Sequence, residues 1–208
     1  MKLLLLLLSG PIISFGQNVN IPDANFKAYL INNTAINRNG DKKIQVSEAS
    51  AFNGNIDCHK MYISNLKGIE AFTALTELSC YDNQLKSLDV SKNTALNVLR
   101  CRSNQITSLD VSKNTDLTLL DCDRNQLTSL DVSKNTVLTQ LYCTGSKLTS
   151  LDVSKNTALT VLRCSGNQIT SLDVSKNIAL TDLWCDGNKF DCAALIRKYG
   201  IVNKNSGF

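Results

Sequence analysis

The sequence predicts a right-handed α/β-solenoid, predominantly β, with a parallel strand sheet on one wall, an extended far wall and short helical caps at both ends. The main observation is a strict repeat, because near-identical units such as residues 75–95 follow one another at a spacing of 21 residues. Each unit carries one cysteine in the same place, at Cys80, Cys101, Cys122, Cys143, Cys164 and Cys185. A period of about 20–29 residues is typical of chains in which every unit forms one turn of a coil.

The first half of the unit predicts the strand wall, through the pattern L-x-x-L-x-C-x-x-N of residues 75–83. Successive side chains of a strand point to opposite faces, so Leu78 and Cys80 point inward while Tyr81 points outward. Asn83 turns the chain away from the strand. A stacked column of such amides can hydrogen-bond the turn backbones.

The second half of the unit repeats this pattern with a valine, since residues 85–93 follow L-x-x-L-x-V-x-x-N. Extended structure is therefore expected on both walls, with Val90 and its equivalents packing inward from the far wall. The result is a flattened, weakly curved coil. One unit is irregular, because Ser146 stands where the others have the first asparagine, and we expect a local weak point there.

The eight cysteines raise the question of disulfides. Neighbouring strands lie about 4.8 Å apart, and parallel Cα–Cβ vectors hold the Cβ atoms farther apart than the ~3.8 Å of a disulfide. We therefore expect reduced, buried thiols along the column, and zinc is less favoured still because its ligands must converge on one point. Cys192 lies outside the column; pairing with Cys185 is the alternative to the expected buried thiol.

With these nested motifs, the chain resembles bacterial leucine-rich-repeat proteins of the 21-residue class and is similar to the cysteine-containing internalins of bacterial surfaces. The resemblance covers residues 58–188. It implies secretion or surface display, recognition of a protein or a glycan, and no catalytic residues. The chain ends soon after its last unit without a wall-sorting or membrane tail, which departs from the surface-anchored members.

The repeats divide the chain into four segments. One lysine followed by an apolar run predicts a secretory signal peptide, with a retained anchor as the alternative. We expect a monomer without a membrane span, secreted or extracellular, or else associated with the cell surface. The segments are the signal peptide (1–16), an EF-hand-like helical N-terminal cap (17–56), the leucine-rich repeats (57–189) and a C-terminal cap (190–208).

Composition narrows the function classes. A net charge of +4 with acids and bases interleaved argues against a nucleic-acid binder, which concentrates basic residues on one face. His59 is the single histidine, and no serine or cysteine stands in a nucleophile motif with a base. We therefore expect no enzymatic activity.

One loop of the N-terminal cap has the register of an ion-binding loop. Asn37, Asn39, Asp41 and Glu48 take the first, third, fifth and twelfth positions of an EF-hand, which predicts a calcium site. Lys42 occupies the sixth position, where this loop requires glycine, so an ion-free, truncated EF-hand is the alternative. No other cofactor is expected.

The outward strand positions differ from unit to unit, whereas the residues around them are repeated almost unchanged. Exposed far-wall positions such as Ser91 and Lys92 have not diverged, so weak packing constraint alone does not explain the variation. We interpret the variable strip as a binding face for a protein or a glycan. Its expected binding residues are Tyr81, Arg100, Arg102, Asp121, Asp123, Tyr142, Arg163, Asp182, Trp184 and Asp186.

Three residues of this face occupy one position in consecutive units. Tyr142, Arg163 and Trp184 predict an arginine stacked between two aromatic rings, and these residue types dominate interface hot spots. The alternative is a stack that only stiffens the sheet. The same register predicts charge pairs of a few tenths of a kcal/mol, Arg100 with Asp121 and Arg102 with Asp123.

The far wall presents columns of equal charge, with lysines at Lys92 and its equivalents and aspartates at Asp89 and its equivalents. A solvated coat that resists aggregation is expected, with a site for an anionic polymer as the alternative. For the chain as a whole, the alternative to a binding module is a non-catalytic structural spacer or adhesive stalk without a dedicated ligand.

Overall fold

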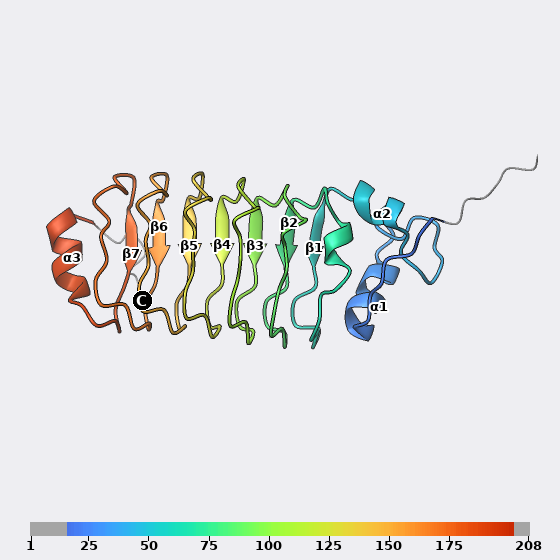
Figure 1. The fold of residues 1–208 in the computed structure, drawn as a ribbon, viewed down its shortest axis with the longest axis horizontal. Coiled ribbons are helices and arrows are strands. Elements are labelled where there is room, and N and C mark those ends of the chain that lie inside the picture. Colours follow the sequence, from blue (N-terminus) through green and yellow to red (C-terminus); the bar gives the residue numbers. More distant parts are fainter. Residues whose placement is uncertain (1–15, 202–208) are drawn as a thin grey trace, which may run out of the picture.

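The computed structural model describes residues 16–201. It is an elongated coil in which the strands stand side by side, with α1 (Ala24–Asn32) and α2 (Val46–Ala51) at one end and α3 (Cys192–Tyr199) at the other (Figure 1). The predicted solenoid with a parallel sheet and small helical caps is confirmed. The predicted signal peptide, apart from its last residue, and the end of the C-terminal cap lie outside the described residues.

The strands form one parallel sheet that follows chain order. From β2 onward, each residue pairs with its equivalent one unit later, as Leu78 does with Leu99. The period of the sequence is therefore the step from strand to strand. The strands are β1 (Asn55–Asp57), β2 (Glu77–Ser79), β3 (Val98–Arg100), β4 (Leu119–Asp121), β5 (Gln140–Tyr142), β6 (Val161–Arg163) and β7 (Asp182–Trp184).

The core is a stack of similar layers between the two walls. Leu78, Cys80, Leu85 and Val90 are fully buried, and their equivalents in the following units are buried too. Burial of each leucine contributes about 1.5–3 kcal/mol, and the small thiol fills the space beside it. The far wall consists of turns and irregular backbone and adds no strand among residues 16–201.

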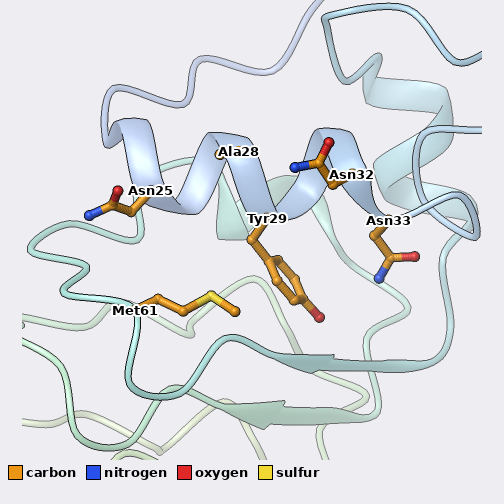
Figure 2. A pocket seen from close by; sticks show the side chains of 6 residues that line it. All are labelled: Asn25, Ala28, Tyr29, Asn32, Asn33 and Met61. Carbon is orange, nitrogen blue, oxygen red and sulfur yellow. The ribbon is translucent and has the colours of Figure 1, made fainter.

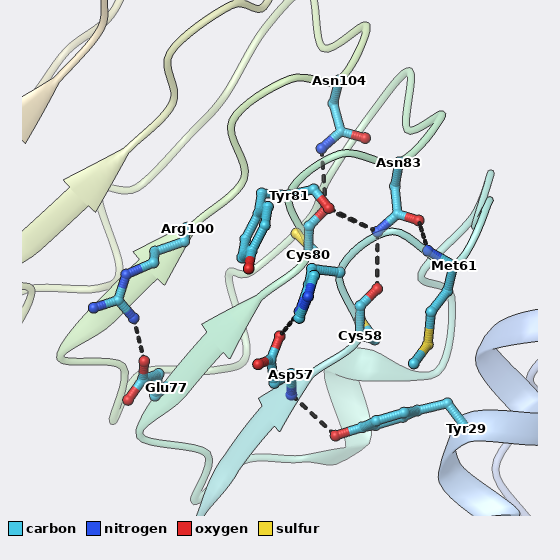
Figure 3. Close-up of polar contacts among 11 residues, drawn as sticks. Tyr29, Asp57, Cys58, Met61, Glu77, Cys80, Tyr81, Asn83, Arg100 and Asn104 are labelled. Atoms are coloured by element: carbon cyan, nitrogen blue, oxygen red, sulfur yellow. Dashed lines mark hydrogen bonds and ion pairs between the residues drawn. The ribbon is translucent and has the colours of Figure 1, made fainter.

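One column of asparagines closes the turns after the strands, as the sequence predicts. The Asn125 amide nitrogen donates to the carbonyl oxygens of Cys101 (3.1 Å) and Cys122 (3.0 Å), and its oxygen accepts the N–H of Ile106 (3.1 Å). Figure 3 shows the same arrangement at Asn83, which contacts Cys58 and Met61. These bonds satisfy buried backbone groups that water cannot reach. The column comprises Asn83, Asn104, Asn125, Asn167 and Asn188.

The irregular unit lacks this amide. The Ser146 hydroxyl oxygen is buried and has no hydrogen-bond partner among the described residues. A serine side chain is too short to span the carbonyl oxygens of two units, so the turn is less well connected here, in agreement with the predicted weak point.

A second asparagine column supports the far wall with fewer bonds. The Asn114 amide nitrogen donates to the carbonyl oxygens of Val90 (3.0 Å) and Asn93 (2.8 Å). Its own oxygen is buried without a partner among residues 16–201. The equivalent residues are Asn93, Asn135, Asn156 and Asn177.

Each end of the coil is covered by a helix with defined termini. Asp23 caps α1 by accepting the N–H groups of Asn25 and Phe26, both at 3.0 Å, and Phe26 and Leu30 are fully buried. At the other end, Asp191 caps α3 and Gly200 ends it in the left-handed conformation. The caps thereby shield the apolar cross-sections of the terminal units.

The C-terminal cap contains a disulfide that joins Cys185 of the last unit to Cys192 at the start of α3. The expectations of a reduced thiol at Cys185, the last member of the column, and of a free, buried thiol at Cys192 are therefore wrong. Constant register separates neighbouring thiols within the column, but the chain reverses between β7 and α3 and brings these two Cα atoms to 5.5 Å. The other six cysteines are free and buried, as predicted.

Candidate binding surface

The outward side chains of the strand wall form columns whose members are set by the parallel register. The last strand position gives the column Asp57, Ser79, Arg100, Asp121, Tyr142, Arg163 and Trp184. Two residues later, beyond the inward cysteine, stand His59, Tyr81, Arg102, Asp123, Thr144, Ser165 and Asp186. All ten sequence-predicted binding residues lie on this wall.

The predicted stack is present at the C-terminal half of this wall. The guanidinium of Arg163 lies over the rings of Tyr142 and Trp184, at 5.3 Å from each centroid. The Tyr142 hydroxyl donates to the side-chain oxygen of Gln140 at 2.7 Å, which fixes the tyrosine ring. The arginine is thus held with both faces covered.

A second stack lies at the N-terminal half of the wall. His59 stacks on Tyr81 with centroids 4.4 Å apart, and Arg102 lies 4.6 Å from the centre of the same tyrosine ring. His59 also pairs with Asp57 at 2.6 Å. This stack is not predicted from the sequence, although the register of His59, one unit before Tyr81, is the signal that could have revealed it.

The predicted charge pairs are wrong in their partners. Arg100 pairs with Glu77, one strand back, and not with Asp121 (Figure 3). Arg102 reaches Asp121 at 4.0 Å, and no ion pair joins it to Asp123 among the described residues. Register gives each side chain a neighbour on both sides, and the long arginine side chains reach past it to a carboxylate at a diagonal position.

The two central carboxylates are held in a partly buried position. Burial raises the pKa of Asp121, and burial together with the charge of Asp121 raises the pKa of Asp123 to about 6. Asp123 accepts the N–H of Thr144, which opposes this shift. A raised carboxyl pKa means that the negative charge is poorly solvated and poorly compensated.

Several polar atoms near the C-terminal stack are buried and have no hydrogen-bond partner among the described residues: Asp182 Oδ1, Arg163 Nε and Trp184 Nε1. Asp182 is only 5% exposed although it occupies the first, outward position of β7. Burial without a partner is unfavourable for a polar group, and residues that tolerate it often have a functional role.

The predicted calcium loop is closed by its own hydrogen bonds. Glu48 accepts the N–H groups of Arg38 (3.0 Å), Asn39 (3.4 Å) and Gln45 (3.0 Å), so both of its oxygens are engaged. Asp41 accepts the N–H of Lys43 at 2.7 Å. The Asn39 oxygen likewise accepts a loop N–H, while that of Asn37 is buried without a partner among residues 16–201.

The side-chain oxygens of the loop therefore fit an ion-free arrangement better than the coordination sphere of an ion. No group of three or more histidine, cysteine, aspartate and glutamate side chains in residues 16–201 is placed to hold a metal ion. Calcium binding stays a prediction, and a rise in melting temperature at millimolar calcium would support it.

A shallow pocket lies where α1 faces the loop after β1 (Figure 2). Tyr29 projects from α1 toward Met61, and its hydroxyl oxygen accepts the N–H of Asp57 at 2.9 Å. Asn25, Asn32 and Asn33 complete the rim. The contact joins the cap to the first strand, and sequence reasoning missed it because it lies outside the repeat.

Comparison with solved structures shows what the fold is similar to. The functional domain of InlJ from Listeria monocytogenes, which includes a cysteine ladder, is 40% identical, with a TM-score of 0.64 over 83% of this chain and 43% of that one. The leucine-rich-repeat protein LIC12759 of Leptospira interrogans is 27% identical, with a TM-score of 0.56 over 59% of this chain and 34% of that one.

The chain has a leucine-rich-repeat fold that is similar to that of the internalins. Internalin C2 of Listeria monocytogenes, at 19% identity, shares the fold, with a TM-score of 0.62 over 86% of this chain and 90% of that one. No protein-family model matches the chain, and no match is found among curated proteins. The internalin-like chain spans less than half the length of the InlJ and Leptospira structures.

The buried cysteine column of this internalin-like protein has low chemical reactivity. Burial raises the pKa of the Cys58 and Cys164 thiols to about 12 and holds that of Cys80 well above its usual range. Because the thiolate is the reactive form of cysteine, these thiols are poor nucleophiles and poor metal ligands. The cysteine column contributes to packing, and the candidate site is the outward surface of the strand wall.

Proposed function

We propose that this chain is an exported, non-catalytic binding module that recognises a protein or a glycan through its variable strand face. The observation that carries the proposal is the contrast between the two walls. Outward residues differ on the strand wall, whereas the far wall repeats its aspartate, serine and lysine in unit after unit. A face that binds one ligand varies from unit to unit, because each of its units contacts a different part of that ligand.

The far wall has a structural reason for its constancy. The Asp131 carboxylate accepts the N–H of Ser133 at 2.8 Å, and this bond, repeated in every unit, closes a turn and lowers the pKa of the aspartate. Lys134 and its equivalents are exposed beside these turns. A regular solvated coat explains the far wall without a ligand, which leaves the strand face as the candidate.

The stack of Tyr142, Arg163 and Trp184 is the proposed hot spot. Tryptophan, tyrosine and arginine are the residues most enriched where truncation weakens interfaces by about 2 kcal/mol or more. The arginine is already oriented by both rings, so little side-chain entropy is lost when a partner binds.

The test is a binding screen against glycan arrays and panels of purified extracellular proteins. A specific ligand should lose binding by about 30-fold or more with Tyr142→Ala/Trp184→Ala. The matched control, Lys134→Ala/Lys155→Ala on the far wall, should bind like the wild type. A ligand that is insensitive to the first pair, or no ligand across broad panels, would favour the spacer function.

Export is part of the proposal and has its own measurement. Cleavage after residue 16 would make Gln17 the first residue of the mature protein. Mass spectrometry of the protein from the culture medium should show this N-terminus. Among residues 16–201, no helix is long and apolar enough to cross a membrane. A monomeric mass in light scattering would support the proposed monomer.

A further inference from the structure

The strand face carries its charges unevenly along the coil. In the N-terminal half, acids and bases contact each other, as Asp57 does with His59 and Glu77 with Arg100. From β4 to the end of the repeats, the outward positions hold one guanidinium, Arg163, against four carboxylates. These are Asp121, Asp123, Asp182 and Asp186.

The one arginine does not neutralise these carboxylates by contact. Arg163 lies between two aromatic rings and has no carboxylate within 4.0 Å among the described residues. Its attraction to Asp121 and Asp123 is the weaker, longer-range kind. Arg102 approaches Asp121 at 4.0 Å, the outer limit of an ion pair.

Three of the four carboxylates, Asp121, Asp123 and Asp182, are also poorly solvated, whereas Asp186 is exposed. Asp182 is 5% exposed, and its Oδ1 lacks a hydrogen-bond partner in the described part of the chain. Burial, with Asp121 adjacent, raises the pKa of Asp123. A buried anion is screened less than an exposed one, so the three partly or fully buried carboxylates produce a stronger negative potential than their number suggests.

Asp123 is faced by charged and titratable groups of both signs. Burial raises the pKa of Asp123 most, the charge of Asp121 raises it further, and the charge of Arg163 lowers it by less than Asp121 raises it. The groups are Asp82, Arg102, Asp121, Arg124, Tyr142 and Arg163.

We propose that the C-terminal half of the strand face docks a basic segment of a partner protein, with lysine or arginine side chains placed over Asp121 and Asp123. This inference rests on the proposed function and specifies its partner. The carboxylates supply the missing attraction, and the rings of Tyr142 and Trp184 attract cations as well. An acidic ligand would be repelled, and a neutral sugar would leave the carboxylates uncompensated.

The chain contains a built-in reporter for this site. Trp184 is its single tryptophan, so a change in tryptophan fluorescence reports on binding at the C-terminal half of the strand face. The probes are oligolysine and oligoarginine, with oligoglutamate and a neutral peptide of equal length as comparisons. The basic peptides should give a saturable change that weakens with salt, and the other two should give none.

Two double variants separate a site from net charge. Asp121→Asn/Asp123→Asn keeps the shape and the acceptor for the Thr144 N–H, and should weaken binding of the basic peptides about tenfold or more. Asp131→Asn/Asp152→Asn removes the same charge from the far wall and should leave binding unchanged. Equal losses in both variants would show general electrostatic attraction and overturn the proposal.

The pH dependence of oligolysine binding is a further, independent test. Protonation of Asp123 removes one of the charges that hold the cation, so affinity for oligolysine should fall as pH drops from about 7.5 to about 5. The Asp121→Asn/Asp123→Asn variant should lose most of this dependence. Binding that strengthens toward acid, or no fluorescence change with either basic peptide, would also overturn the proposal.

The proposed function can survive that failure. A neutral or acidic ligand that binds the wild type and is lost in Tyr142→Ala/Trp184→Ala would retain the binding face while excluding the basic partner. If the glycan and protein screens also find no mutation-sensitive ligand, the binding module itself is excluded.

Discussion

The two walls of the coil are built from the same short motif but are held together differently. The strand wall has main-chain pairing, and its Asn125 uses both ends of the amide, donating to carbonyl oxygens and accepting an N–H. The far wall has turns, and its Asn114 only donates. The better-connected wall is the one whose outward residues vary.

This difference explains where variation is tolerated. On the strand wall, main-chain bonds and buried amides fix the backbone, so outward side chains such as Arg100 and Trp184 are free to differ. On the far wall, the outward Asp131 closes the turn itself. A change there removes part of the scaffold, which keeps the sequence constant.

The largest effect is expected for a substitution that breaks the asparagine column of the strand wall. Asn125→Ala leaves several buried backbone groups without partners and should lower the free energy of unfolding by about 3–4 kcal/mol. Asn114→Ala removes only donated bonds and should lower it by about 2 kcal/mol. Urea unfolding of both variants measures the difference, and equal losses would contradict the comparison.

Completing the strand-wall column should have the next largest effect. Ser146→Asn places an amide within reach of the carbonyl oxygens of Cys122 and Cys143, by analogy with Asn125, and should raise stability by about 1–2 kcal/mol. Ser146→Ala is the control, because it removes the unpaired hydroxyl without adding bonds. Thermal unfolding that ranks the alanine variant above the asparagine variant would refute this prediction.

A smaller effect concerns pH. The folded-state pKa of Asp123, about 6, lies above that of an unfolded aspartate, so the folded chain binds the proton more tightly. The contribution of Asp123 to stability therefore falls as pH rises from about 4 to about 6 and stays unfavourable above it. After allowance for solvent screening, Asp123→Asn should raise the free energy of unfolding by about 1 kcal/mol at neutral pH and leave it unchanged at pH about 4. Denaturant unfolding at both pH values checks the sign.

The smallest effect is expected for an outward far-wall side chain that closes no turn. Lys134→Ala removes an exposed charge and should change the free energy of unfolding by less than about 0.5 kcal/mol. A loss above 1 kcal/mol, roughly, in the same urea assay would mean that the lysine column contributes to the scaffold.

The sequence predicts whatever the repeat dictates. The 21-residue register places Leu78, Cys80 and Val90 inside and brings Tyr142, Arg163 and Trp184 together, because strand pairing converts equal spacing into contact. Calcium binding and the ligand of the face stay predictions.

Features that depend on rotamers or on the caps could not be obtained in this way. Arg100 had a carboxylate on both sides, and register alone does not choose between them. The disulfide of Cys185 with Cys192 and the contact of Tyr29 with Asp57 arise where the chain leaves the repeat, so no internal comparison could indicate them.

The disulfide of the C-terminal cap makes the two ends of the coil unequal. Units in such arrays contact only their neighbours, so opening begins at an end and travels inward. The bond between Cys185 and Cys192 ties the last rung to the helix that covers it, whereas the opposite end is held by packing and hydrogen bonds in the described residues. We expect fraying, proteolytic attack and mechanical peeling to start at the N-terminal cap, which leaves the acidic C-terminal half of the strand face as the last part to lose its shape.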